Sequence, residues 1–198
     1  MIIGDRVLWL DLETSGSDDQ EEGAALLELG IVITDIYGFR EVAAQNWVYG
    51  LEAYQLKHLT KWDPVVIDMH TKSGLLAEVL KTSKTLDYRE ILTWIEGHID
   101  RTSPTKFDTL GGDPKLPLAG SGVSHFDRRW LVEFLPGLAD HLTYWAYDVG
   151  VLRRVFELAS PRHVLRINEN KPHRALDDVR IHLEEFRHYF NLIRGLKL

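Results

Sequence analysis

The chain has no cysteine among its 198 residues. Disulfide bonds and thiolate metal ligands are therefore excluded. No apolar run approaches the ~20 residues that a membrane-spanning helix needs. The start of the chain, Met1 to Asp5, also lacks the basic residues and the long apolar stretch of a secretion signal. We therefore expect a protein without a membrane segment, with the cytoplasm as its default compartment.

Basic residues are also in short supply. The chain has 23 Lys and Arg against 30 Asp and Glu, a formal net charge of −7. This balance argues against a protein that coats long nucleic acid through a broad basic surface. It allows an enzyme whose bound cations offset an acidic pocket, and it favours a short substrate that is gripped at one end. Hydrophobic residues at 44% and charged residues at 27% are typical of a soluble globular protein.

The order of the expected elements indicates the fold class. Apolar segments predict strands, and helical spacing of apolar residues predicts helices. The expected strands are 6–12, 29–34, 42–49, 116–119 and 143–147, with a turn at 35–38, and the expected helices are 88–99, 128–135, 149–159 and 174–190. Strands first, then strands alternating with helices, predict an α/β fold with a mixed sheet flanked by helices.

We expect one domain over residues 1–198, a length at which a single core is normal. The segment 101–117 is rich in Pro, Gly, Thr and Asp, and it is predicted to be an inserted loop that is long enough to be functional. Asp87 and Glu90 have the spacing of a capping box at the start of a helix.

Two acids stand two residues apart in the first predicted strand. Asp11 and Glu13 follow the apolar run Val7 to Leu10, and side chains at that spacing point to the same face of a strand. Two carboxylates on one face repel unless a cation lies between them, and hard cations such as Mg²⁺ prefer carboxylate oxygen. For an isolated Asp-x-Glu, a solvated strand end is the commoner explanation. The apolar run before the two acids makes that explanation weaker here, because it places them at the edge of a buried sheet.

Three further polar residues each have an ordinary structural explanation when taken alone. Asp127 stands at the start of a predicted helix, where Asp is a common N-cap. Asp178 lies near the start of the last predicted helix, where an acid suits the helix dipole. His173 follows Pro172 at a loop-to-helix junction, and on its own it is an ordinary exposed histidine.

The combination is more specific than its parts. The chain has an Asp-x-Glu strand, then an Asp at a helix start, then His-x-x-x-x-Asp. The matching residues are Asp11 and Glu13 in Leu10-Asp-Leu-Glu-Thr-Ser-Gly16, Asp127, and His173 with Asp178 in His173-Arg-Ala-Leu-Asp-Asp178. This pattern resembles the DEDDh exonucleases of the ribonuclease H-like superfamily. Within it, the sequence is most similar to the oligoribonuclease family, over nearly the whole chain. Asp177 competes with Asp178, and the family spacing from His173 favours Asp178.

The resemblance implies a 3′→5′ exoribonuclease that degrades short single-stranded RNA to 5′-mononucleotides. It implies two divalent ions, Mg²⁺ or Mn²⁺, held directly or through waters by Asp11, Glu13, Asp127 and Asp178. His173 is the expected general base, because the ordinary histidine pKa of about 6.5 suits proton removal near neutrality. The resemblance also implies a homodimer.

Residues that bind the substrate are harder to assign. The segment from Trp62 to Ser73, Gly74 and Leu75 resembles a substrate-side region of the family, and Trp62 either stacks on a base or packs in the core. Ser73 and Gly74 are expected to start a helix and to offer a backbone contact to the substrate.

The chain departs from the family pattern at two places. The family has an apolar wedge after Gly16, and here Ser17 follows, so the wedge is either missing or supplied by another residue such as Leu26 or Leu27. Tyr144 matches a family tyrosine that caps the 5′ phosphate, but Trp145 stands where the family has arginine, which puts a strict dinucleotide preference in doubt. Arg128 or Arg129 is an alternative phosphate contact.

Two alternatives remain open at this point. One is an exonuclease of the same superfamily that acts on single-stranded DNA or in proofreading. The other, from a different class, is a non-catalytic module that binds nucleic acid or protein on the same fold. The presence of all five catalytic-type residues argues against a pure binding module, which has no need of clustered acids.

Overall fold

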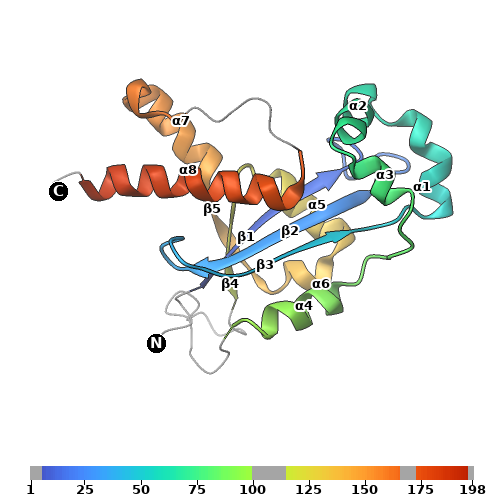
Figure 1. Cartoon of the computed structure of the whole chain (residues 1–198), viewed down its shortest axis with the longest axis horizontal. Helices are drawn as coiled ribbons and strands as arrows, with labels where there is room; N and C mark the ends of the chain where they lie inside the picture. Colours follow the sequence, from blue (N-terminus) through green and yellow to red (C-terminus); the bar gives the residue numbers. More distant parts are fainter. Residues whose placement is uncertain (1–5, 100–114, 166–172, 196–198) are drawn as a thin grey trace.

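The computed structural model describes residues 6–99, 115–165 and 173–195. Its centre is a five-stranded mixed sheet with the strand order β3-β2-β1-β4-β5 (Figure 1). The first three strands form an antiparallel meander, and β4 and β5 continue the sheet parallel to β1. The strands are β1 (Arg6–Thr14), β2 (Leu26–Asp35), β3 (Glu41–Val48), β4 (Leu116–Gly120) and β5 (Leu142–Asp148).

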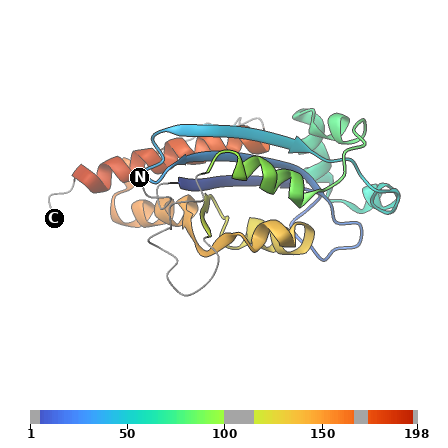
Figure 2. The ribbon, with the colours of Figure 1, turned by 90° about the horizontal axis from the view of Figure 1, so that it is seen from below.

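Helices cover both faces of this sheet. They are α1 (Ala53–His58), α2 (Pro64–Lys72), α3 (Leu75–Val79), α4 (Tyr88–Glu96), α5 (Phe126–Phe134), α6 (Pro136–Ala139), α7 (Val149–Ala159) and α8 (Ala175–Gly195), with short 3₁₀ turns η2 (Leu59–Lys61) and η3 (Pro161–His163). In Figure 1 the sheet lies between α8 above and α4 and α6 below, and Figure 2 views it from the side of α4, with α8 behind the strands. The helices α1 to α3 gather beyond one end of β2.

The alternation of β1 separates two hydrophobic cores. Leu8, Leu10 and Leu12 pack with buried residues of α4, α5 and α6. Val7 and Trp9 point to the opposite face, where they pack with α7 and α8. The period of two along a strand places the next side chains on the α8 face at Asp11 and Glu13. The apolar part of β1 therefore directs these two acids toward the first turn of α8.

Most elements expected from the sequence are confirmed, including the mixed sheet and the helix over 149–159. The first strand is longer than expected and continues to Thr14, because its pairing with β2 extends that far. Pro136 begins α6 instead of only ending the helix before it. The helices α1 and α2 were not predicted, and α3 begins at Leu75 after Gly74, as expected for a helix start at that point.

Two local predictions have mixed outcomes. Asp87 caps α4 by accepting a hydrogen bond from the Arg89 amide, but Glu90 does not complete the capping box and instead accepts hydrogen bonds from Trp47 and Lys84. Of the predicted inserted loop, residues 101–114 lie outside the described residues, whereas 116–117 belong to β4. Among the residues that the structure describes, no helix is both long and apolar enough to cross a bilayer.

Candidate active site

Three of the predicted acids meet where β1 passes under the start of α8. Each of Asp11, Glu13 and Asp178 offers a carboxylate oxygen, and these oxygens all lie within 4.8 Å of one another. Asp178 lies in the first turn of α8 and is only 3% exposed, whereas its neighbour Asp177 is exposed to solvent. Of the two neighbouring acids, the structure therefore places Asp178 in the cluster and Asp177 outside it.

Asp127 approaches the same stretch of β1 from α5. Its side chain is 3% exposed, and its Oδ1 accepts a hydrogen bond from the amide of Leu12, 3.1 Å away. Leu12 lies between Asp11 and Glu13, so Asp127 is fixed beside the acid cluster, although it is not one of the three residues whose oxygens converge. The N-cap explanation for Asp127 is wrong, because His125 occupies the N-cap position of α5. Burial raises the pKa of the Asp127 carboxyl to about 7.

A capping residue on the neighbouring strand holds the turn that leads to Asp127. Asp148, at the end of β5, caps α7 by accepting hydrogen bonds from Gly150 and Val151. It also accepts hydrogen bonds from the amides of Gly122 and Ser124, in the turn between β4 and α5. One carboxylate thus joins the ends of two parallel strands, which fixes the start of α5 and therefore Asp127.

The donor set fits a divalent cation. Like charges on directly opposite strand positions destabilise a sheet, and the register pairs Glu13 with Glu28 of β2. Glu28 is compensated by Arg174, whose Nη2 lies 2.7 Å from its Oε1. The acids on β1 and α8 offer only carboxylate oxygens, which are the ligands that Mg²⁺ and Mn²⁺ prefer. Repulsion among three carboxylates this close falls when a cation binds between them.

Directly before α8 stands His173, the predicted general base. It is half-buried, and its backbone has a φ of 49°, in the left-handed region. Among the described residues it is the only non-glycine residue with a positive φ, and for a residue with a Cβ that conformation is strained. The predicted general base is therefore held in an unfavourable backbone conformation, five residues before Asp178.

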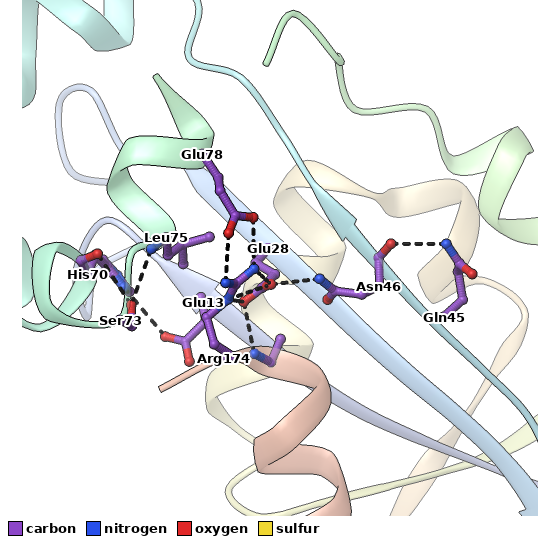
Figure 3. Close-up of polar contacts among 10 residues, drawn as sticks. Glu13, Glu28, Gln45, Asn46, His70, Ser73, Leu75, Glu78 and Arg174 are labelled. Atoms are coloured by element: carbon purple, nitrogen blue, oxygen red, sulfur yellow. Dashed lines mark hydrogen bonds and ion pairs between the residues drawn. The ribbon is translucent and has the colours of Figure 1, made fainter. Parts of the chain in front are cut away.

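His70 of α2 also reaches the acids, although the sequence left its role open. The ring is fully buried, and Nε2 donates a hydrogen bond to the carbonyl oxygen of Thr14, 2.9 Å away. Its Nδ1 lies 3.9 Å from Oε2 of Glu13 (Figure 3). Burial lowers the pKa of His70, and the nearby His173 lowers it further. His70 therefore braces the end of β1 that carries Glu13.

Sequence reasoning missed two residues that border the cluster. His182 lies one turn after Asp178 on α8, with Nδ1 3.8 Å from Oδ1 of Asp11. Its spacing of four residues from Asp178 was the available signal, because residues four apart share a helix face. Glu28 is fully buried in the apolar strand β2, and a single acid within the run Leu26 to Ile33 was the sequence sign of a specific partner.

The predicted substrate residues have divided outcomes. Trp62 is 4% exposed, and its indole N–H donates a hydrogen bond to Gly23, so the structure supports the packing alternative over base stacking. Leu75 is fully buried in the same small core, and a role for its side chain in substrate contact is therefore not supported. Leu26 and Leu27 are also buried, so neither supplies the apolar wedge.

The remaining three lie at or near the surface. Ser73 Oγ donates a hydrogen bond to the His70 carbonyl and accepts one from the amide of Leu75. Gly74 precedes α3 with a φ of 78°, a conformation that favours glycine. Tyr144 is 86% exposed on β5, which is an edge strand of the sheet.

Known proteins resemble this chain in sequence over most of its length. No protein-family model matches it. A protein of Dictyostelium discoideum named "Probable oligoribonuclease" is 31% identical over 191 residues, covering 93% of this chain and 88% of that one. The oligoribonuclease of Wigglesworthia glossinidia brevipalpis is 27% identical over 183 residues, covering 92% and 90% of the two chains.

Solved structures share its fold at low sequence identity. The zinc-bound complex of E. coli exonuclease I with single-stranded DNA has a TM-score of 0.64 at 11% identity, covering 96% of this chain and 41% of that one. The nuclease domain of 3′hExo, a DEDDh family member bound to rAMP, has a TM-score of 0.53 at 13% identity, covering 98% and 94%.

The sheet order and the converging acids define the class: this is a ribonuclease H-like fold of the kind found in DEDDh exonucleases. The sequence relatives narrow the class further. The chain belongs to the oligoribonuclease family.

Proposed function

We propose that this chain is a metal-dependent 3′→5′ exoribonuclease that degrades short single-stranded RNA to 5′-mononucleotides. The observation that carries the proposal is the convergence of Asp11, Glu13 and Asp178 within 4.8 Å in a member of the oligoribonuclease family. A binding module would gain nothing from three carboxylates in repulsion, whereas a nuclease uses them to hold cations.

Each residue has a defined part in this proposal. Asp11, Glu13 and Asp178 hold two divalent ions, Mg²⁺ or Mn²⁺, and Asp127 completes the set directly or through water. When bound, such ions acidify a water molecule and stabilise the oxygen that leaves the phosphate. His173 removes the proton of the attacking water, which an imidazole does efficiently near neutral pH.

We expect the substrate to be short, since the formal charge of −7 gives little support for binding a long polyanion. The test is product analysis with end-labelled RNAs of two to about twenty nucleotides and with DNAs of the same sequences. The proposal expects stepwise release of 5′-mononucleotides from the 3′ end of RNA, fastest for the short chains. Equal or faster hydrolysis of DNA would favour the alternative of a DNA exonuclease, and internal cuts would contradict both.

We also propose that the protein is a cytoplasmic homodimer, on the basis of its family. Exposed apolar side chains on α7 and the adjacent strand β5 support a partner surface: Tyr144, Val151, Val155 and Leu158 are between 53% and 88% exposed. Light scattering at micromolar concentration tests the dimer, and a monomeric mass would contradict it.

A further inference from the structure

Arg174, the residue after His173, is held between two carboxylates (Figure 3). Its Nε and Nη2 donate to Glu28 of β2 at 3.0 and 2.7 Å. Its Nη1 and Nη2 donate to the two carboxylate oxygens of Glu78 on α3, both at 2.9 Å. The two partners differ in environment: the Glu28 side chain is fully buried, whereas that of Glu78 is 50% exposed.

Glu28 makes more contacts than this ion pair. Its Oε2 accepts a hydrogen bond from the amide of Ala175, 2.9 Å away, and its Oε1 accepts one from the side chain of Asn46 at 2.7 Å. Ala175 is the first residue of α8. The buried carboxylate therefore binds both the side chain of Arg174 and the backbone directly after it, and removing its charge would leave one edge of a partly buried guanidinium without its anionic partner.

An independent contact places the same turn of α8 on β2. Gly30 lies two residues after Glu28 on the same face of the strand, opposite Asp11 in the sheet register. A Cβ at Gly30 would lie 2.5 Å from backbone atoms of Ala175 and Leu176, so the helix start rests directly on the strand. Glu28 supplies the hydrogen bonds, and Gly30 allows the close approach.

These contacts at the start of α8 affect the backbone of His173, which is strained. A φ of 49° is costly for a residue with a Cβ and persists only where the surroundings enforce it. The hydrogen bonds from Arg174 and from the amide of Ala175 to Glu28 fix the backbone that directly follows His173. The same turn carries Asp178, whose amide donates to the carbonyl oxygen of Arg174 at 2.9 Å.

We propose that Glu28 and Arg174 form a positioning clamp that holds His173 and Asp178 in their reactive arrangement without touching the RNA. The inference rests on the proposed function, since it assigns the clamp to the base and to one acid of that site. Arg174 uses both edges of its guanidinium on Glu28 and Glu78, which favours positioning over the direct capture of a phosphate.

The matched variants Glu28→Gln and Glu78→Gln test the clamp, because each removes the negative charge of one of the two carboxylates that bind Arg174. We expect Glu28→Gln to lower kcat by about 10- to 100-fold, the range found when groups that orient catalytic ligands are removed, with KM changed less than about 3-fold. Glu78→Gln is expected to stay within about 2-fold of the wild type, because its ion pair is half exposed. Assays run well below the melting temperature, on protein whose folded fraction is measured by circular dichroism.

Variants of Arg174 keep the test decisive if Glu28→Gln folds poorly. Arg174→Gln is expected to lower kcat like Glu28→Gln, and Arg174→Lys, which keeps the charge, is expected to recover part of that loss. The double variant Glu28→Gln/Arg174→Gln is expected to be no worse than the poorer single variant, because the two residues act as a unit.

Three outcomes would overturn the clamp. One is a lower melting temperature with unchanged kcat per folded molecule, which is the result of a purely structural role. Another is a raised KM at constant kcat in the Arg174 variants, which indicates a phosphate contact. The third is an equal loss in Glu28→Gln and Glu78→Gln. In each case an active wild type and an inactive His173→Asn leave the proposed function intact, whereas an inactive wild type contradicts the function itself.

Discussion

Asp178→Asn is expected to reduce the release of 5′-mononucleotides from RNA by about 10³-fold or more. The substitution removes one of the three carboxylates whose oxygens converge within 4.8 Å, and an amide is a poor ligand for a hard cation. Metal ions contribute several kcal/mol of transition-state stabilisation in phosphoryl chemistry, and a loss of about 4 kcal/mol corresponds to about 10³-fold in rate. The measurement is initial velocity on an end-labelled short RNA with saturating Mg²⁺ or Mn²⁺.

The chain provides a closely matched control in the adjacent acid. Asp177→Asn makes the same chemical change one residue earlier, at an exposed position of the same helical turn. We expect its velocity to stay within about 2-fold of the wild type, since exposed charges contribute little. The rise in melting temperature that Mn²⁺ gives the wild type should also survive in Asp177→Asn and disappear in Asp178→Asn. Similar velocities for the two variants would refute the assignment of Asp178.

Asp127→Asn is expected to inactivate the enzyme while stabilising the metal-free protein above neutral pH. Burial raises the pKa of the Asp127 carboxyl to about 7 in the folded state, above the value of about 3.9 for an unfolded chain. The protonated Asp127 side chain therefore makes its full contribution to the free energy of unfolding below about pH 4, and this contribution is lost as the pH rises through about 7. An asparagine cannot ionise, and its carbonyl oxygen can still accept the hydrogen bond from Leu12.

The size of this effect follows from the difference in pKa. About three pKa units correspond to about 4 kcal/mol, and relaxation around the charge reduces this, so we expect about 2 kcal/mol in favour of Asp127→Asn at pH 8. Urea unfolding of both proteins in EDTA, between pH 4 and 8, measures it. The advantage of the variant should shrink toward pH 4, while its activity with metal falls by at least about 10²-fold. A wild type that gains stability relative to the variant as the pH rises would contradict the burial of this charge.

The sequence could predict which acids lie on one face of an element, because that depends on local spacing. Asp11 and Glu13 share a strand face by periodicity, and the family resemblance, through its spacing from His173, favoured Asp178 over Asp177. The structure adds what a linear pattern does not contain. Asp127 is a buried hydrogen-bond acceptor for Leu12, 115 residues away, and not the helix cap that its local sequence indicated.

Residues whose roles depend on distant partners could not be assigned from the sequence. Trp62 looks the same in sequence whether it stacks on a base or packs in the core, and only its burial against Leu75 distinguishes the two. Glu28 and Arg174 are 146 positions apart, and neither lies in a motif that indicates the other. The helices α1 and α2 were missed because neither presents a long apolar face: α1 contributes no buried residue, and α2 reaches the small core only through Ile67.

The central claim is that the carboxylates of Asp11, Glu13 and Asp178 hold divalent cations for RNA hydrolysis. Anomalous diffraction from a crystal grown with Mn²⁺ and a 5′-mononucleotide tests it most directly, because manganese scatters anomalously and reports its own position. The account predicts manganese peaks within coordination distance of these three side chains, next to the phosphate of the nucleotide. A nucleotide bound at this site with no manganese at the three carboxylates, or manganese bound only elsewhere, would contradict it.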